Sequence, residues 1–283
     1  MLSSTITINA GNTTGSTTVN SLGDDVDESN ETIILNITGV SGGEGAVENG
    51  TQTVTFTITD DDTSGFTVAE SSGTSVSEAG STDTFTVVLN SKPTGNVVFN
   101  VTSGDTGEDT VSPSALTFTT GNWNSAQTVT VTGVNDSIDD GNVNSTTTIA
   151  INTGSTADST YDSVSSQTVT VTTADDDTAG FTVTQSGGST SVTEVGSTDT
   201  FTVVLNTQPT GDVVFALTDN DTDNSEISYS PTALTFTSGN WNSAQTVTVT
   251  GVDDSIDDDN VTSVITVAIN TGSTADSVYD GLA

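Results

Sequence analysis

The chain contains no histidine and no cysteine, and its only basic residue is Lys92. Against that single positive charge stand 38 Asp and Glu residues among 283, so the formal net charge is −37 at pH 7. The missing residue types exclude thiolate and imidazole metal ligands, disulfides, and Ser-His-Asp or Cys-His nucleophiles. Most familiar enzyme chemistry is thereby excluded, and we expect a protein that is not an enzyme.

The scarcity of Lys and Arg also argues against two classes of partner. Nucleic acids and anionic membranes are bound through basic side chains that neutralise phosphate groups. No apolar run approaches the roughly 18 residues of a membrane-spanning helix, and the start "MLSSTITINAG" lacks the basic and apolar regions of a signal peptide. We expect no nucleic-acid binding and no membrane insertion, and we expect any targeting signal to lie outside this segment.

Hydrophobic residues are scarce as well, at 31%, which brings the composition close to that of disordered chains. Their order nevertheless indicates a folded chain. Val, Ile, Phe and Leu alternate with Thr in "DTFTVVLN" at 83–90 and "QTVTVT" at 167–172. This period of two is typical of half-buried strands, and the β-branched Thr suits their outer face. We predict an all-β protein with thin cores.

The most informative pattern is an internal repeat of 115 to 118 residues. "GSTDTFTVVLN" occurs at 80–90 and again at 196–206, and "GNWNSAQTVTVTGV" occurs at 121–134 and again at 239–252. A more divergent copy opens the chain, with "DDVDESN" at 24 in place of "DSIDDGN" at 136. The expected units are a first repeat (1–63, the back half of a copy), a second repeat (64–178, a full copy) and a third repeat (179–283, a copy without its last strand).

Seven strands are predicted in the second repeat, separated by clusters of Gly, Asn, Asp and Ser. Seven short strands without helical periodicity predict an immunoglobulin-like β-sandwich. Tandem sandwiches of this kind would form a rod, and the short "DDDTAG" junction favours a stiff hinge over a flexible linker. The predicted strands are 65–70, 84–90, 96–102, 115–119, 126–134, 146–152 and 167–173.

Two stretches resemble known repeat families. "DDVDESNETIILNIT" at 24–38, followed by a strand and "TDDDTSG" at 59–65, resembles the Calx-beta motif. The region from "LTFTTGNWN" at 116 to "STADSTYD" at 155 resembles a related repeat of very large bacterial surface and matrix proteins. The resemblance covers nearly the whole chain. It implies a Calx-beta-like, immunoglobulin-like fold, an extracellular location, and in some members Ca²⁺ ions bound in loops at one end of the sandwich.

Acidic residues of the second repeat cluster in alternate loops. Loops after the first, third, fifth and seventh strands of an up-and-down sandwich lie at the same end, and Ca²⁺ needs six to eight oxygen ligands from segments that meet in space. We therefore predict a calcium site there. The resemblance separately assigns ligand roles to Glu78, Asp109, Asp136, Asp140 and the terminal aspartates. Asp105 is expected to lie in the same loop as Glu108 and Asp109. The full set of predicted ligands in the second repeat is Glu78, Glu108, Asp109, Asp136, Asp139, Asp140, Asp175, Asp176 and Asp177.

The other two repeats carry related acidic sets. Ile227 takes the position of Asp109 in the third repeat, with Glu226 or Asp223 as alternative ligands. Without cations the clustered carboxylates repel one another, so we expect the metal-free rod to loosen at its junctions. The predicted ligands are Asp24, Asp27, Glu28, Asp60, Asp61 and Asp62 in the first repeat, and Glu194, Asp223, Glu226, Asp254, Asp257 and Asp258 in the third.

Several of these features also have a purely structural interpretation. The acids could be solvated loop residues that confer solubility or salt tolerance, although a halophilic surface would scatter them over strand faces that here carry Thr. Trp123 and Trp241 are expected to be core or corner residues, and Tyr161 and Tyr279 to be corner tyrosines that bond to the backbone. The expected core aromatics are Phe66, Phe85, Phe99, Phe118, Phe181, Phe201, Phe215 and Phe236.

Three functions remain open at this level. The first is a calcium-stiffened structural segment of an extracellular adhesin, matrix or filament protein, whose partners are calcium ions and neighbouring repeats. The second is a filament subunit that joins identical chains head to tail by strand donation. The third is a ligand-binding adhesin module, which the closeness of the repeats to one another makes the least favoured.

Overall fold

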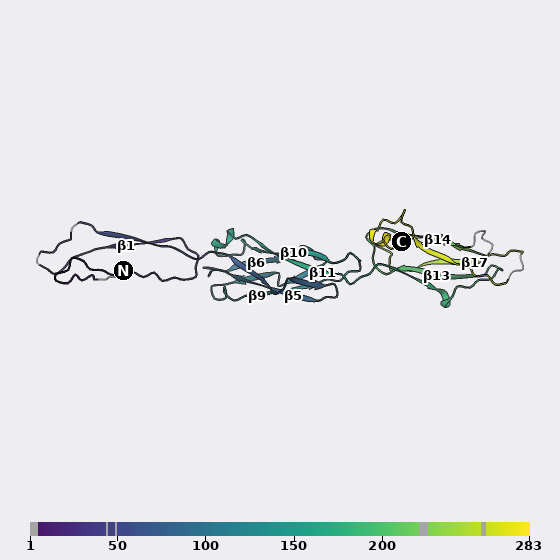
Figure 1. The fold of residues 1–283 in the computed structure, drawn as a ribbon, viewed down its shortest axis with the longest axis horizontal. Helices are drawn as coiled ribbons and strands as arrows, with labels where there is room; N and C mark the ends of the chain where they lie inside the picture. The colour runs from purple at the N-terminus through teal and green to yellow at the C-terminus, as the bar shows by residue number, and fades with distance from the viewer. Residues whose placement is uncertain (1–4, 44, 49, 221–225, 256–258) are drawn as a thin grey trace.

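The chain folds into an elongated row of β units. The computed structural model describes residues 5–43, 45–48, 50–220, 226–255 and 259–283. Figure 1 shows the first repeat with β1, the second with β5, β6, β9, β10 and β11, and the third with β13, β14 and β17, arranged end to end along the long axis. The fold is an all-β, immunoglobulin-like sandwich architecture, because two mostly antiparallel sheets enclose the core of the second repeat and of the third repeat.

The second repeat contains two sheets. One has the order β4-β11-β10-β6-β8, in which only the β4–β11 pair is parallel, and the other has the order β3-β5-β9-β7. Along β5 and β9, alternate residues are buried because successive side chains point to opposite faces. The strands are β3 (Phe66–Glu70), β4 (Thr74–Ser77), β5 (Thr82–Leu89), β6 (Val97–Thr102), β7 (Asp109–Ser112), β8 (Ala115–Phe118), β9 (Gln127–Gly133), β10 (Val143–Ile151) and β11 (Gln167–Ala174).

Two strand segments, β4 and β7, are absent from the sequence-based prediction. Each belongs to a strand that crosses from one sheet to the other: β3 pairs with β5 while β4 pairs with β11, and β7 pairs with β9 while β8 pairs with β6. Gly73, with φ of 87°, lies at the first crossing and Pro113 at the second. A proline cannot donate to a ladder, so pairing breaks there. When β3 with β4, and β7 with β8, are each counted as one crossing strand, the nine segments correspond to the seven predicted strands.

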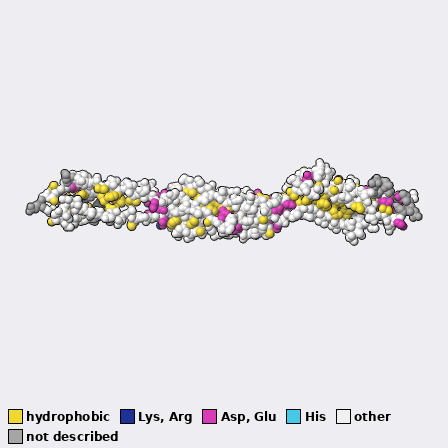
Figure 2. All heavy atoms as spheres, in the orientation of Figure 1, with side chains coloured by type: hydrophobic (Ala, Val, Ile, Leu, Met, Phe, Trp, Pro, Cys, Tyr) yellow, Lys and Arg dark blue, Asp and Glu magenta, His cyan; other side chains and the backbone are white. Residues whose placement is uncertain are grey.

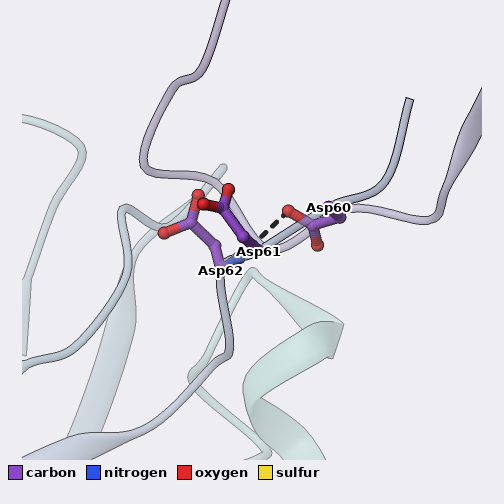
Figure 3. A group of neighbouring side chains, drawn as sticks. All are labelled: Asp60, Asp61 and Asp62. Carbon is purple, nitrogen blue, oxygen red and sulfur yellow. Dashed lines mark hydrogen bonds between the residues drawn. The ribbon is translucent and has the colours of Figure 1, made fainter.

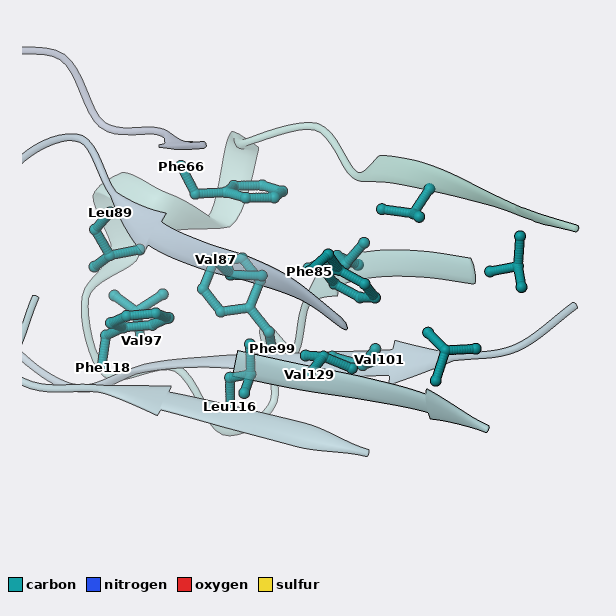
Figure 4. Packing of buried hydrophobic residues seen from close by; sticks show 14 of the residues in the cluster. Phe66, Phe85, Val87, Leu89, Val97, Phe99, Val101, Leu116, Phe118 and Val129 are labelled. Atoms are coloured by element: carbon teal, nitrogen blue, oxygen red, sulfur yellow. The ribbon is translucent and has the colours of Figure 1, made fainter. Parts of the chain in front are cut away.

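The core of the second repeat lies between the sheets (Figure 4). Phe99 is fully buried at its centre and packs edge-on against Phe66 and Phe118, with ring centroids 4.8 and 5.8 Å apart. Valines and leucines of β5, β6, β8 and β9 fill the remaining space. This confirms the expected core aromatics of the second repeat, and Trp123 is half-buried against the same core.

The third repeat reproduces much of this arrangement. Its core centres on Phe215, packed edge-on against Phe181 and Phe236. Its sheets have the orders β12-β13-β17-β15 and β16-β14-β18, so among the described residues no strand takes the places of β4 and β11. The elements are β12 (Phe181–Gln185), η2 (Ser186–Gly188), β13 (Thr198–Leu205), β14 (Val213–Asp219), β15 (Ile227–Ser230), β16 (Ala233–Phe236), β17 (Gln245–Gly251), β18 (Ile265–Ile269) and α1 (Ser277–Asp280).

The first repeat has little regular structure among its described residues. It contains one antiparallel pair, β1 (Glu31–Asn36) with β2 (Thr53–Ile58). Apolar side chains of this pair remain exposed, including Ile34 at 61%, Val54 at 56% and Phe56 at 40%. Within the described residues, the pair therefore lacks a covering sheet like the one that buries the matching strands of the second repeat.

The corner tyrosines behave as the sequence predicts. Tyr161 follows the cap residue Asp158 in the short helix η1 (Ser159–Ser163), and its hydroxyl donates to the backbone carbonyl of Ser91 at 2.6 Å. The Asp158 carboxylate accepts hydrogen bonds from both Thr94 and Thr160. Tyr279 and Asp276 repeat this arrangement in the third repeat. These residues close the end of each sandwich opposite to the loops described next.

Candidate metal site

Four loops of the second repeat meet at the end that faces the third repeat. They follow β4, β6, β9 and β11, and Figure 2 shows acidic side chains gathered at the narrow points between units. Carboxylate oxygens of Glu78, Glu108 and Asp140 lie within 4.8 Å of one another, and so do those of Glu78, Asp175 and Asp177. Glu78 belongs to both groups, so the five residues form one cluster, which we call the acidic pole.

The local backbone explains why Glu78 lies at the centre of this pole. Its amide donates to the carbonyl of Ala174 at 3.1 Å, which extends the β4–β11 pairing to the last residue before the aspartate triplet. At the end of β9, a Cβ atom on Gly133 would lie only 2.1 Å from the carbonyl oxygen of Ser77. A side chain at that position is sterically excluded, so glycine is what allows β9 to pass close beside the Glu78 loop.

Three carboxylate oxygens in and beside the pole are buried without a partner. Glu78 is 2% exposed, Glu108 is 7% exposed and Asp109 is fully buried. One oxygen of each, Oε2 of both glutamates and Oδ1 of Asp109, has no hydrogen-bond partner within the described part of the chain. Burying an unpaired carboxylate oxygen is costly, and native structures rarely leave such atoms unsatisfied. The pole therefore fits a positively charged occupant.

Burial and mutual repulsion raise the pKa values of Glu78, Glu108, Asp140 and Asp177. Burial, followed by the charges of Asp136 and Asp175, raises the pKa of Glu78 to about 7. Burial is also the main cause of the raised pKa values of Glu108 and Asp140, with neighbouring aspartates second. With one Lys in the whole chain, no protein cation offsets this repulsion.

The other predicted ligands of the second repeat occupy different surroundings. The Asp109 carboxylate accepts a short hydrogen bond from the hydroxyl of Ser145 through its second oxygen. Asp136 is half-buried and accepts from the backbone amide two residues further on, at 2.7 Å, while Asp105 makes a similar turn at 3.0 Å. Asp176 is exposed and belongs to neither group of close carboxylates. These aspartates shape the loops around the pole or face solvent.

Asp139 forms part of the junction with the third repeat. Its Oδ2 accepts from the amide of Ala179 at 2.7 Å, and the carbonyl of Ser137 accepts from the amide of Gln208 at 2.6 Å. The loop that supplies Asp140 to the pole is thus also bonded to the next repeat. A shift of this loop would therefore change both the acidic pole and the hydrogen bonds to the third repeat.

The junction between the first and second repeats uses the same bonds. Asp27 accepts from both the amide and the hydroxyl of Ser64, and the carbonyl of Asp25 accepts from the amide of Lys92 at 2.6 Å. The hydrogen bonds from Ser64 lower the pKa of Asp27. Because these residues occupy positions equivalent to Asp139, Ala179, Ser137 and Gln208, the repeat sequence encodes a repeated junction geometry.

Asp60, Asp61 and Asp62 form the third close group of carboxylates (Figure 3). The amide of Asp62 donates to Oδ1 of Asp60 at 3.2 Å, and Oδ2 of Asp60 accepts from the amide of Glu28 at 2.8 Å. Burial and then the neighbouring charges raise the pKa of Asp62. Asp24 accepts from the backbone amide two residues on, at 2.9 Å. The group is open, with Asp61 exposed, and lacks a buried glutamate at its centre.

The third repeat does not reproduce the acidic pole among its described residues. Glu194, at the position of Glu78, is exposed, and Ile227 is 9% exposed at the position of Asp109. Glu226 and Asp254 are half-buried, and no group of three close carboxylates occurs in the part of this repeat that the structure describes. The remaining predicted ligands, Asp223, Asp257 and Asp258, lie outside the described residues.

Sequence reasoning missed three contributors to these sites. Ser145 bonds to Asp109, Ser64 bonds to Asp27, and Asp25 contributes a backbone carbonyl to the first junction. Neither serine stands out in a chain this rich in Ser and Thr. Ser64 corresponds to Ala179 in the next repeat, where the backbone amide alone makes the bond. Because a backbone amide makes this bond, the identity of the residue at this position does not reveal it.

The fold and the site together define a tandem immunoglobulin-like β-sandwich protein with acidic loops at its junctions. No family model matches the chain, and no curated protein matches it. No helix in the described part of the chain is long and apolar enough to cross a membrane.

Among solved structures, the chain is similar to several sandwich proteins. CBD12 from CALX1.2 matches at 15% identity over 69% of this chain and 77% of that chain, with a TM-score of 0.29. Domains 4 and 5 of the S-layer protein SbsC match at 28% identity over 44% of this chain and 52% of that one, with a TM-score of 0.26. The E. coli chaperone DraB matches at 9% identity over 67% and 86%, with a TM-score of 0.29. With TM-scores this low, these similarities indicate neither the function of this chain nor a cation that it binds.

Proposed function

We propose that this chain is a calcium-binding, rod-forming segment of an extracellular surface, matrix or filament protein, in which Ca²⁺ at the acidic pole stiffens the junction between repeats. One observation carries the proposal. Buried oxygens of Glu78 and Glu108, which have no hydrogen-bond partner among the described residues, lie in a cluster with Asp140, Asp175 and Asp177 at the end that joins the next repeat. The role is structural rather than catalytic.

The donor set suits Ca²⁺ better than other cations. It offers only hard oxygen ligands, since the chain has no thiol or imidazole. Glu78, Glu108, Asp140, Asp175 and Asp177 supply several carboxylates from separate loops, which matches the high and flexible coordination number of Ca²⁺. Mg²⁺ prefers fewer protein ligands and keeps more of its water. Bound Ca²⁺ would supply the positive charge that the pole lacks.

The stiffening follows from the position of the pole. The loop that supplies Asp140 also supplies Asp139 and Ser137, which bond to the third repeat. Repulsion within the metal-free pole pushes this loop outward, and a cation that removes the repulsion holds it against Ala179 and Gln208. Ca²⁺ binding and junction geometry are therefore coupled through a single loop.

An extracellular location accords with this chemistry. Modules outside cells bind Ca²⁺ with dissociation constants of about 10⁻⁴ to 10⁻³ M, which suits the cation concentrations there. The chain has no cysteine, so it has no disulfides to stabilise its small cores. A cation bound across loops supplies a comparable cross-link. The resemblance of the acidic turns to Calx-beta repeats supports the same proposal.

Calorimetric titration and thermal melts test the proposal. At Ca²⁺ concentrations near 100 times the dissociation constant we expect a stabilisation of about 2.7 kcal/mol relative to EDTA. Mg²⁺ at equal concentration should give much less. Glu108→Gln should remove most of the calcium effect, whereas the matched control Glu48→Gln, in an exposed loop of the first repeat, should leave it unchanged. Identical melts in EDTA and in Ca²⁺ would refute the proposal.

A further inference from the structure

A groove of about 1140 Å³ opens between the two sheets of the third repeat. Six of the residues that line it correspond, at the repeat offsets of 116 and 118, to positions of the second repeat. Residues Thr190, Val192, Glu194, Ser263, Ile265 and Val267 of the groove correspond to Thr74, Val76, Glu78, Ser145, Thr147 and Ile149.

In the second repeat, these six positions surround strand β11. Val171 pairs with Ser145 of β10 on one side and with Thr74 of β4 on the other. The inward side chains of β11, Val169, Val171 and Thr173, are at most 1% exposed. The groove of the third repeat is therefore the place that a strand like β11 occupies in a complete sandwich.

The groove leaves apolar side chains and a strand edge uncovered. Val192 and Val267 are half-buried, whereas Val76 and Ile149 at the matching positions are 3% and 0% exposed. Val183, on the facing sheet, is 43% exposed. Within the described residues β18 pairs only with β14, so its other edge offers free backbone groups. Such an edge is a template for strand addition.

We propose that this groove binds strand β2 of a second copy of the chain. The sequence of β2 and its flanks, "QTVTFTITDDDTSG" at 52–65, matches "QTVTVTTADDDTAG" at 167–180, which contains β11. In this alignment Val54, Phe56 and Ile58 take the positions of the three buried side chains of β11. Val54 is 56% and Phe56 40% exposed in their own repeat, so insertion, which exchanges the pairing of β2 with β1 for pairing with β18, buries apolar surface on both partners.

Two further contacts follow from the alignment. Gln167 donates to the carbonyl of Phe66 at 2.6 Å, and Gln52 has the same position ahead of β2, facing the carbonyl of Phe181 after insertion. Asp60 and Asp62 would come beside Glu194, as Asp175 and Asp177 lie beside Glu78. Only this second contact rests on the proposed calcium binding, because the approach of these carboxylates needs a cation or high salt.

Donor and acceptor surfaces lie in different repeats of the same chain. A contact between two different surfaces gives a closed ring only if the rotation between successive copies brings the last copy back to the first. Otherwise, repeated insertion builds an open, head-to-tail filament. The donor strand β2 belongs to the first repeat and the residues that line the groove belong to the third, and Figure 1 shows these two repeats at opposite ends of the row. The geometry therefore predicts growth along the long axis.

Sedimentation of the unmodified full chain and four variants tests this. Phe56→Asp disables the donor strand and Val183→Asp disables the groove, while Thr55→Asp and Thr184→Asp place the same charge on exposed outward positions of the same strands. In 1 M NaCl, electrostatic repulsion between the acidic chains is screened beyond about 3 Å. Under this condition we expect the unmodified chain and both Thr variants to form multimers of the 28.6 kDa chain as the protein concentration rises. Each disabled variant should stay monomeric.

Mixing the two disabled variants gives the decisive result. One has an intact groove and the other an intact strand, so an equimolar mixture should form a dimer and nothing larger. A synthetic peptide of residues 51–65 should bind the Phe56→Asp chain but not the Val183→Asp chain, and circular dichroism should confirm that both variants are folded. The salt series is run in EDTA and in Ca²⁺, so a missing calcium response is distinguished from a missing insertion.

Two outcomes overturn the proposal. A chain that stays monomeric at all concentrations in 1 M NaCl, with and without Ca²⁺, does not donate β2. A monomeric chain that nevertheless binds the 51–65 peptide has a strand-accepting groove, but its occupant is another segment than the second copy's β2.

Discussion

Replacing Glu78 by Gln should stabilise the metal-free second repeat at high pH while removing its response to calcium. Glu78 is 2% exposed, its Oε2 has no hydrogen-bond partner in the part of the chain that the structure describes, and its pKa is raised from 4.5 to about 7. Gln has nearly the same shape and no charge. The substitution therefore removes the buried charge without opening a cavity, so the two proteins differ mainly in electrostatics.

The sign of the pH dependence follows from the raised pKa. A carboxyl group whose pKa is higher in the folded state binds a proton more tightly there, so stability is full below about pH 4.5 and declines as the pH rises to about 7. The shift corresponds to at most about 3 kcal/mol, at about 1.4 kcal/mol per pH unit. In EDTA, E78Q should match the unmodified chain near pH 4.5 and exceed it in stability by up to that amount at pH 8.

The assay follows urea unfolding through tryptophan fluorescence. The chain has two tryptophans, so a Trp241→Phe background leaves Trp123 as the reporter of the second repeat. In saturating Ca²⁺ the order should reverse, because the unmodified pole gains its cation and the Gln variant loses a ligand. Stability curves of the two proteins that run parallel from pH 4.5 to 8 in EDTA would show that Glu78 is not a strained buried charge, and the reasoning would fail.

Three further predictions concern the fold and the junction. Gly133→Ala should destabilise the second repeat by about 3 kcal/mol or more in urea unfolding, because its Cβ would lie 2.1 Å from a carbonyl oxygen. Gly141→Ala should cost only about 1 kcal/mol, because its Cβ would meet no atom within 4 Å and only the positive φ of 73° disfavours a side chain there. A smaller effect of the first than of the second would contradict the close approach. Tyr161→Phe should cost about 1–3 kcal/mol through the lost hydrogen bond to the backbone, and equal melting temperatures would rule that out. Asp139→Ala should shorten the maximum dimension in X-ray scattering with Ca²⁺ present while leaving the melting of the second repeat unchanged, and an unaltered scattering profile would remove Asp139 from the junction.

Much of the fold follows from local pattern. The alternation of Val and Thr predicts strands, and the internal repeat predicts tandem units. The seven-strand count holds once β3 with β4, and β7 with β8, are read as strands that cross between sheets. The crossings themselves were not predicted, because which sheet a segment joins depends on its hydrogen-bonding partners and not on its own alternation.

The convergence of the acidic loops was predictable for a related reason. In an antiparallel sandwich the parity of the strands decides which loops share an end, so Glu78, Glu108, Asp140 and Asp175 fall at one end on topology alone. Which of them are buried was not predictable. Asp176 and Asp177 are adjacent in sequence, yet only Asp177 belongs to the close group, because the chain direction at the end of β11 turns one side chain inward and the other to solvent.

The sequence by itself determined the β class, the repeat, the scarcity of positive charge, with one Lys against 38 acidic residues, and the ends of the strands at which the acids lie. These properties depend on residue identity and on the period-two pattern, which are local. Only the tertiary structure decided that oxygens of Glu78, Glu108 and Asp109 are buried without partners among the described residues, that the junctions share one hydrogen-bond geometry, and that the third repeat keeps an open groove. Those properties arise where segments distant in sequence pack together, and no single segment encodes them.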